Sequence, residues 1–263
     1  MEIDYLNAGS GELIVLVHGA LADKRMWIPH MNLLQDKYEV LSLTQRHFDG
    51  QSQGPFGLNT HAQDLAEFLG NQFSTHSRIH LIGWSYGADV VLNTLTQHAL
   101  PVSSAMVYEP GFPGCVNETD MALLGSDAQQ MFGPVFSAVA EGQLDKAVEA
   151  LIDGSGNQTG YFHSQPEVLK KQQLELANTL PLQLDRSEFP KLDEIALGNL
   201  DIPVTVAFGS RTRSLFGVVS KSVHHAIPGS QLCEIEGANH MLPLESPDKF
   251  TTIISEHMER IQR

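Results

Sequence analysis

The sequence contains few cysteines and no pattern that is typical of a metal site. Its 263 residues include only Cys115 and Cys233. Two thiols so far apart form neither a disulfide framework nor a zinc knuckle, so we expect both to be reduced, as in the cytoplasm. None of the 12 histidines stands in an HExxH motif, and the neighbours His224 and His225 fall in a predicted helix, where they point to different faces. We therefore expect no bound metal.

Basic residues and long hydrophobic runs are also scarce. The chain has 16 Lys and Arg against 31 Asp and Glu, a formal charge of −15. An acidic surface repels nucleic acid and anionic lipid. The apolar runs are too short to span a bilayer, and residues 1–4 lack the basic and apolar regions of a signal peptide. We expect a cytoplasmic protein that binds a small molecule, and neither nucleic acid nor membranes; nothing in the sequence specifies an oligomeric state.

Short apolar runs alternate with amphipathic stretches along most of the chain. Hydrophobic residues make up 42% and charged residues 18%, as in ordinary globular enzymes. The run at 13–17 is uniformly apolar, which is typical of a strand buried on both faces. The pattern predicts an α/β fold, a mostly parallel sheet flanked by helices. The predicted strands are an edge strand at 3–6 and strands at 13–17, 38–43, 78–82, 104–108, 204–208 and 231–235.

The helical segments divide the chain into a core and an insertion. A Thr60-x-x-Gln63 capping box predicts one helix start, and Ser246-Pro247 predicts the start of the last helix. Residues 111–190 contain no convincing strand but have helical stretches at 143–151 and 167–180. We therefore predict a core of residues 1–110 and 191–263, with 111–190 inserted as a helical cap.

A nucleophile motif stands between a predicted strand and a predicted helix. Gly83-Trp84-Ser85-Tyr86-Gly87 has the form G-x-S-x-G. A sharp strand-to-helix turn holds the serine in strained backbone geometry, and the flanking glycines permit close approach. The helix N-terminus offers backbone N–H groups to an oxyanion. This context predicts Ser85 as a nucleophile.

The loop after the first long strand, which reads His18-Gly19-Ala20, predicts a second oxyanion donor. We expect the N–H groups of Ala20 and Tyr86 to form the oxyanion hole. His18 itself is better interpreted as a brace for this loop than as a chemical group.

A serine hydroxyl needs a base, and one histidine is well placed for that role. His240 ends the loop Gly237-Ala238-Asn239 after the last predicted strand. Its position 155 residues after Ser85 fits the Ser–acid–His chain order of G-x-S-x-G hydrolases. We predict His240 as the base, and His80, inside a strand, as a core residue.

These motifs resemble the α/β-hydrolase superfamily over nearly the whole chain. The residues that carry the resemblance are His18-Gly19, Gly83-x-Ser85-x-Gly87 and Gly237-x-x-His240. The resemblance implies the fold and a serine hydrolase with a helical cap, but it does not specify a substrate, because the fold hosts many chemistries. The N-terminus looks shorter than usual, which makes the family's first edge strand a candidate for loss.

The acid is where the sequence departs from the family pattern. Family members usually carry Gly-x-x-Asp after the strand that is here 204–208, but this chain has Thr212 in the Asp position. Haloalkane dehalogenases place the acid after the preceding strand, where this chain has Glu109. The resemblance thus implies Glu109 as the third catalytic residue; the alternative is that Glu109 is a purely structural carboxylate and that the site has no acid or one from elsewhere in the chain. Arg211 and Arg213 are expected to face solvent or pair with acidic groups rather than to bind a substrate carboxylate.

The expected reaction is hydrolysis of a small carboxylic ester, or a related acyl substrate, through an acyl-enzyme on Ser85. A serine excludes the aspartyl-ester chemistry of epoxide hydrolases and haloalkane dehalogenases. Carbon–carbon bond hydrolysis, lactone opening, thioester cleavage, acyl transfer and a non-catalytic ligand-binding role remain as alternatives. Trp84, Met131 and Phe132 are candidate pocket residues, with core packing as the alternative. No cofactor is expected, since the sequence has neither a G-x-G-x-x-G after a strand nor a P-loop.

Overall fold

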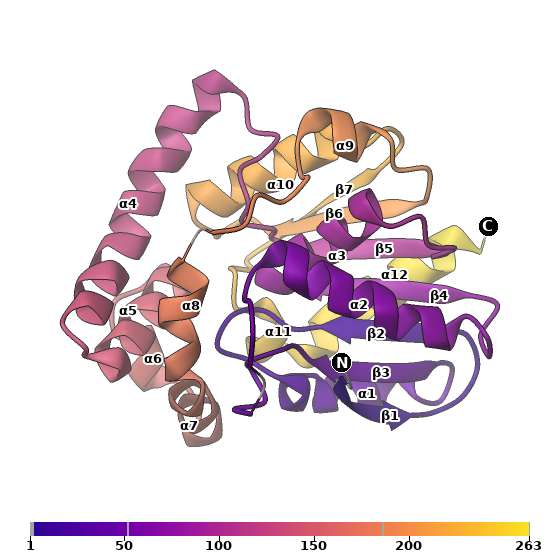
Figure 1. Cartoon of the computed structure of the whole chain (residues 1–263), viewed down its shortest axis with the longest axis horizontal. Coiled ribbons are helices and arrows are strands. Elements are labelled where there is room, and N and C mark those ends of the chain that lie inside the picture. The colour runs from indigo at the N-terminus through magenta and orange to yellow at the C-terminus, as the bar shows by residue number, and fades with distance from the viewer. Residues whose placement is uncertain (1–2, 52, 186, 263) are drawn as a thin grey trace.

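The chain forms one seven-stranded sheet with helices on both faces (Figure 1). The structure is a computed structural model and describes residues 3–51, 53–185 and 187–262. Only the first strand is antiparallel, so the carboxyl ends of the other six meet at one edge of the sheet. In sheet order the strands are β1 (Asp4–Ala8), β3 (Glu39–Thr44), β2 (Leu13–Val17), β4 (Ile79–Trp84), β5 (Ser104–Tyr108), β6 (Val204–Gly209) and β7 (Gln231–Ile235).

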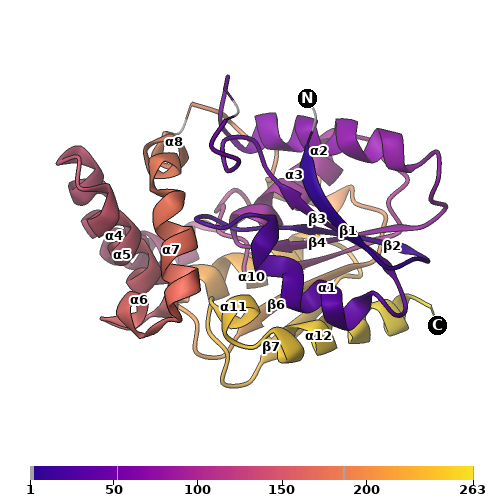
Figure 2. The same ribbon diagram turned by 90° about the horizontal axis from the view of Figure 1, so that it is seen from below.

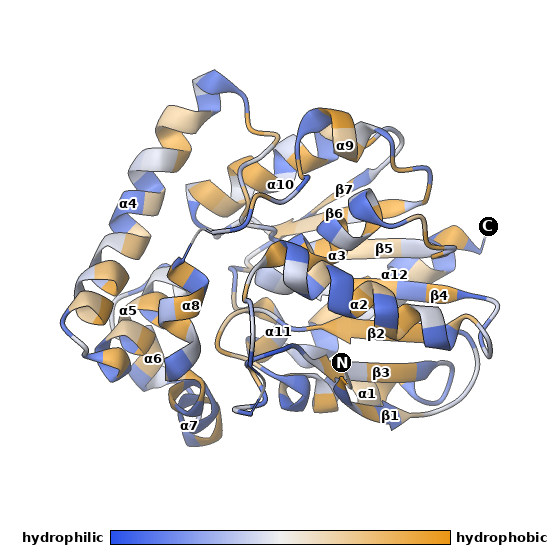
Figure 3. Ribbon diagram, viewed as in Figure 1, coloured by the Kyte–Doolittle hydropathy of each residue, from blue (hydrophilic) through white to orange (hydrophobic). Residues whose placement is uncertain are grey.

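Burial follows strand position in the sheet. Every residue of β2, β4, β5 and β6 is buried, whereas the edge strands β1 and β7 are mostly exposed or half-buried. Figure 3 shows β2 as largely hydrophobic, as expected for a strand covered on both faces. The predicted α/β fold is confirmed. All predicted strands exist, and their bounds differ from the prediction by no more than two residues.

Two layers of helices cover the sheet. On one face α1 (Ile28–Leu34) packs against α12 (Pro247–Ile261), and on the other α2 (Leu58–Gln72) packs against α3 (Tyr86–Gln97) (Figure 2). The second layer continues with α9 (Glu194–Gly198) and α10 (Ser214–Ala226). The short helices η1 (Lys24–Trp27) and α11 (Leu242–Glu245) lie in connections. No helix in the described residues is long and apolar enough to cross a membrane.

The residues between β5 and α9 form helices and loops but no strand in the part that the structure describes. Their helices lie beyond the carboxyl edge of the strands, on the left in Figure 1. The predicted stretch 143–151 falls in one helix, but 167–180 is broken into several. That 111–190 acts as a cap stays a prediction. The helices are α4 (Glu118–Ala140), α5 (Leu144–Gly156), α6 (Tyr161–Ser164), α7 (Glu167–Glu175), η2 (Ala177–Thr179) and α8 (Leu180–Leu184).

The predicted capping box at Thr60 is wrong. Helix α2 starts at Leu58, directly after Gly57, which has no side chain to cap it. The N–H groups of Asn59 and Thr60 instead donate to Glu188, at 2.6 and 3.1 Å, and the Thr60 hydroxyl donates to the same carboxylate. The start of α2 is therefore capped by Glu188, which is distant in the sequence, and not by the Thr60 side chain. The last helix does begin at Pro247, but the Ser246 side chain makes no capping hydrogen bond.

A second core helix is also capped from the insertion. The N-cap residue of α10, Arg213, makes no side-chain cap. Asp127 of α4 accepts a hydrogen bond from Leu215 N–H at 2.9 Å and pairs with the Arg213 guanidinium at 2.5 Å. Because the first N–H groups of a helix lack helical partners, each carboxylate stabilises a helix end that would otherwise need water.

Several histidines are buried in the core. Burial lowers the pKa of His30, His61 and His257 to about 3 and that of His18 to about 4. The hydrogen bonds of His257 to Ser104 and Thr205 are both 2.8 Å long. These imidazoles are neutral in the folded protein at neutral pH, whereas the unfolded chain protonates them near pH 6.5.

Replacing Asp127 by Ala should lower the free energy of unfolding by about 1–3 kcal/mol, because it uncaps α10 and leaves Arg213 unpaired. Urea unfolding of Asp127→Ala and of the exposed control Asp36→Ala measures this. The control should change stability by no more than about 0.5 kcal/mol. Equal losses in the two variants would contradict the capping role.

The free energy of unfolding should fall as the pH drops below about 6.5, because the histidines then bind protons in the unfolded chain but stay neutral in the folded protein. Each buried histidine contributes up to about 1.4 kcal/mol per pH unit until the pH reaches its folded pKa. His30 packs between the rings of Trp27 and Phe250, so His30→Leu should reduce the slope of stability against pH by one proton. The exposed His163→Gln variant should keep the wild-type slope in urea titrations from pH 7 to pH 5.

Candidate active site

Ser85 occupies the turn between β4 and α3. Its backbone has φ 55° and ψ −124°, a strained conformation for a residue with a side chain. A Cβ on Gly87 would lie 2.4 Å from the carbonyl oxygens of Val17 and His18, so only glycine fits there. The turn therefore projects Ser85 from the carboxyl edge of the sheet, at the start of a helix.

His240 lies in the loop after β7 and reaches this serine. Its Nε2 is 2.9 Å from Ser85 Oγ. The ring of Phe216, in the first turn of α10, stacks on the imidazole with centroids 3.8 Å apart and planes 10° from parallel. The Trp84 indole N–H donates to the His240 carbonyl at 2.9 Å. These contacts fix both the backbone and the ring plane of His240.

Glu109 completes a continuous series of hydrogen bonds. It follows β5 with φ 50°, is fully buried, and its Oε2 lies 2.7 Å from His240 Nδ1. Gly209 N–H donates to Oε1 at 2.8 Å, and the Thr212 hydroxyl donates to Oε2 at 2.7 Å. The structure thus brings together the three residues that the sequence analysis selected. Thr212, in the position where the family usually has Asp, donates to the carboxylate that follows the preceding strand.

The candidate oxyanion donors flank the serine. Ala20 and Tyr86 both line the cavity onto which Ser85 opens. Tyr86 is the first residue of α3, so its N–H has no partner within the helix. Their role in holding an oxyanion stays a prediction.

The cavity that contains Ser85 and His240 has a volume of about 470 Å³. Trp84, Met131 and Phe132, the candidate pocket residues, all line it. Its walls are mainly apolar and come from both the strand loops and the inserted helices. Lining residues that the sequence analysis did not select include Phe56, Asp89, Phe112, Val135, Leu151, Leu180, Phe216 and Met241. Only three-dimensional proximity identifies them, since no local motif contains them.

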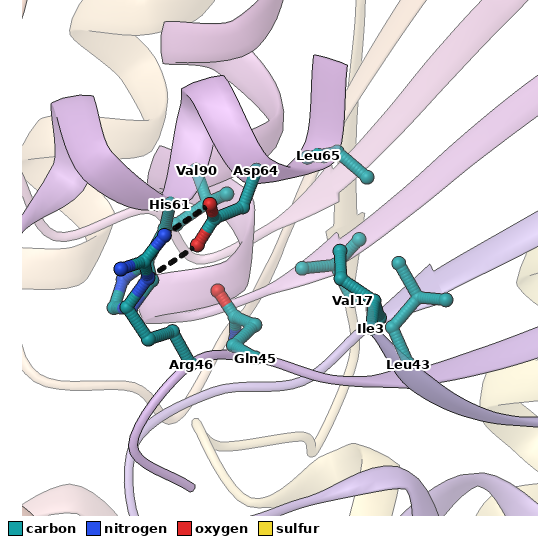
Figure 4. A pocket seen from close by; sticks show the side chains of 9 residues that line it. All are labelled: Ile3, Val17, Leu43, Gln45, Arg46, His61, Asp64, Leu65 and Val90. Carbon is teal, nitrogen blue, oxygen red and sulfur yellow. Dashed lines mark hydrogen bonds and ion pairs between the residues drawn. The ribbon is translucent and has the colours of Figure 1, made fainter. Parts of the chain in front are cut away.

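A second, much smaller cavity is lined by residues of β2, β3, α2 and α3 and of the segments next to them. Its volume is about 10 Å³, close to the minimum for one water molecule, so it cannot hold a substrate. Figure 4 shows His61 beside Arg46, which donates two hydrogen bonds to Asp64. The Tyr86 hydroxyl lies 2.7 Å from His61 Nδ1, so this region positions the residue that follows the serine.

The sequence also led to expectations for His18, Arg211 and Arg213, and the structure places all three as expected. His18 Nε2 accepts a hydrogen bond from Gln45 N–H at 3.1 Å, and its Nδ1 lies 2.8 Å from the Gly19 carbonyl, so it braces the loop as expected. Arg211 is exposed and Arg213 pairs with Asp127, which agrees with the expectation for both.

The described residues contain no group of three His, Cys, Asp or Glu side chains that could hold a metal. His76 and His80 are four residues apart, but they do not share a face. His80, inside β4, contacts Ser104 at 2.8 Å, whereas His76, beyond the end of α2, pairs with Glu39 at 3.0 Å. The two histidines therefore serve different structural contacts.

Curated proteins show two kinds of similarity. A putative 2-succinyl-6-hydroxy-2,4-cyclohexadiene-1-carboxylate synthase from Bacillus subtilis (strain 168) is 24% identical over 272 aligned residues, covering 96% of this chain and 92% of that protein. The nonribosomal peptide synthetase agiA from Aspergillus flavus is 25% identical over 142 residues, 51% of this chain. The match spans only 2% of that much longer synthetase.

Solved structures share the fold at low sequence identity. An esterase, RhEst1, from Rhodococcus sp. ECU1013 superposes with a TM-score of 0.77 and 22% identity, covering 98% of this chain and 95% of that one. MenH from S. aureus gives 0.74 and 20%, with 98% and 99% coverage. A bromoperoxidase from Bacillus anthracis gives 0.75 and 20%, with 98% and 95% coverage.

The model of the alpha/beta hydrolase family matches residues 14–252, which include the last five strands along the chain, all of β2 except Leu13, and the whole inserted segment. The matched range contains Ser85, Glu109 and His240. The chain therefore belongs to the alpha/beta hydrolase family.

Proposed function

We propose that this chain is a serine hydrolase that cleaves a small carboxylic ester, or a related acyl or carbonyl substrate, through an acyl-enzyme on Ser85. The main support is the series Ser85–His240–Glu109, with heavy-atom distances of 2.9 and 2.7 Å, opening onto an apolar cavity. Family membership supports a hydrolase. Cys115 and Cys233 are free, which suits the cytoplasmic location that we also propose.

In the first half of the reaction, Ser85 Oγ attacks the substrate carbonyl carbon while His240 Nε2 takes the hydroxyl proton. The carbonyl oxygen becomes an oxyanion, which accepts hydrogen bonds from the N–H groups of Ala20 and Tyr86. When the tetrahedral intermediate collapses, the carbon–oxygen bond of the ester breaks and His240 returns the proton to the leaving alcohol. The acyl group then remains on Ser85.

In the second half, a water molecule replaces the alcohol. His240 takes a proton from the water, the resulting hydroxide attacks the acyl carbon, and the acid leaves as Ser85 regains its proton. Glu109 holds the His240 Nδ1–H and stabilises the imidazolium that forms in each step. Its hydrogen bonds from Gly209 and Thr212 keep this buried carboxylate oriented.

The inserted segment 111–190 acts in this proposal as the cap that gives specificity. It supplies Met131, Phe132, Val135 and Leu180 to the cavity wall, so the acyl or alcohol group packs against apolar side chains. Lactone opening and carbon–carbon bond hydrolysis would use the same three residues. The non-catalytic alternative depended on the missing Asp at position 212, and the Thr212 bond to Glu109 counts against it.

A fluorophosphonate probe tests the nucleophile without a known substrate. Wild type should be labelled rapidly, Ser85→Ala should not be labelled, and Glu109→Gln should react roughly 10²–10⁴-fold more slowly because the imidazolium loses its counter-charge. Gel fluorescence against time measures the rates. Unlabelled but folded wild-type protein, or an equal rate in Glu109→Gln, would overturn the assignment of the corresponding residue.

Thr212→Val should lower kcat/KM on an ester that wild type cleaves by about 3–10-fold, because Glu109 Oε2 loses one donor. The loss should lie in kcat, since Thr212 is not among the described residues that line the cavity. Thr212→Ser, which keeps the hydroxyl, is the matched control and should retain most of the activity. Equal activity in the valine and serine variants would argue against a positioning role for Thr212.

A further inference from the structure

One carboxylate in the cavity has no part in the proposed mechanism. Asp89 stands one turn along α3 from Ser85, about 6 Å along the helix axis. It lines the same cavity as Ser85 and is only 6% exposed. In a largely apolar cavity, the few polar groups usually fix the orientation of the ligand.

Asp89 accepts hydrogen bonds only from backbone groups among the partners that the structure describes. The N–H of Gly111 lies 3.1 Å from each of its oxygens, and the N–H of Phe112 lies 3.1 Å from Oδ1. No described Lys or Arg forms an ion pair with it. Burial raises the pKa of Asp89 to about 7.

These backbone contacts do not require a charged group. A single Asn side-chain oxygen in the place of Oδ1 would accept one bond from Gly111 and one from Phe112 without the desolvation cost that a buried carboxylate carries; only the Gly111 contact to Oδ2 needs the second carboxylate oxygen. A negative charge in this cavity also opposes the oxyanion that forms beside the Tyr86 N–H. Only neutral backbone donors offset the charge of this buried carboxylate in the described structure, and a positive group of a substrate would supply the missing counter-charge.

Two further acidic side chains line the cavity, so its charged groups are negative in the part that the structure describes. Asp185 and Glu188 line it as well, near the point where the chain returns from the inserted helices. Of the lining residues that the structure describes, none is Lys or Arg. Glu188 is already bonded to the first turn of α2, so Asp89 is the buried carboxylate left to meet a ligand.

We propose that Asp89 is a specificity-determining residue that receives a positively charged amine group of the substrate, so that cationic esters are preferred over neutral and anionic ones. The inference rests on the proposed hydrolase function. It also separates this chain from its Bacillus subtilis relative, whose named product carries a carboxylate, a group that the Asp89 side of the cavity would repel.

The test compares kcat/KM within two sets of esters. The first set consists of nitrophenyl esters of butanoate whose acyl chain ends in a trimethylammonium, tert-butyl or sulfonate group. The esters of the second set carry the same three groups on the alcohol instead of on the acyl chain. In one of the two sets, wild type should prefer the cationic ester over its tert-butyl isostere by about tenfold. In Asp89→Asn this ratio should fall to within about threefold, with the sulfonate ester gaining.

Asp153→Asn is the matched control. Asp153 also accepts backbone N–H groups, from Gly160 and Phe162 at 2.7 Å, but it is not among the described cavity residues. This variant should keep the wild-type preference. The melting temperature of each variant shows whether the fold is retained. A cation-to-neutral ratio that is unchanged by Asp89→Asn in both sets overturns the proposal.

A binding measurement separates this proposal from the proposed function. Calorimetry with the trimethylammonium ester is done on Ser85→Ala and on Ser85→Ala combined with Asp89→Asn, so it needs no turnover. The double variant should bind about tenfold more weakly. If wild type neither reacts with the fluorophosphonate nor cleaves any ester, the hydrolase function fails, whereas equal binding in the two variants removes the role of Asp89 by itself.

Discussion

The hydrogen bonds to the buried Glu109 carboxylate hold the candidate site together. A buried charge is costly unless each of its oxygens has donors, and here the donors come from two separate segments. Gly209 ends β6 and Thr212 lies in the short connection from β6 to α10, whereas His240 follows β7. The hydrogen bonds of this one carboxylate therefore hold the segments after β6 and β7 in place, and they position His240 beside Ser85 in the turn after β4.

Local patterns were sufficient to predict the sheet and to select Ser85 and His240 as candidates. The buried strands could be predicted because strands covered on both faces are uniformly apolar, and Ser85 because its glycine-flanked turn depends on adjacent residues. His240 was selected from its place after the last strand, and Glu109 from the resemblance to family members that carry the acid after the preceding strand. The interaction of Thr212 with Glu109 was not predictable, since it depends on a side-chain contact between residues 103 positions apart.

The features that sequence analysis missed are all non-local. Helix α2 receives its cap from Glu188 rather than from Thr60, which no spacing rule for adjacent residues describes. Phe216 reads as an ordinary apolar residue of an amphipathic helix, yet its ring covers His240. Asp89 carries no sequence signal of burial, yet it is buried and accepts hydrogen bonds from Gly111 and Phe112, at the start of the inserted segment. Tertiary packing, not propensity, determines these roles.

The capping of α10 by Asp127 links the inserted segment to the orientation of the His240 ring. Asp127 belongs to α4 of the inserted segment, and it holds the first turn of α10, which carries Phe216. The ring plane of His240 therefore depends, through Phe216 and the start of α10, on a carboxylate of the inserted segment. Two helices of different parts of the fold thus share the task of orienting one imidazole.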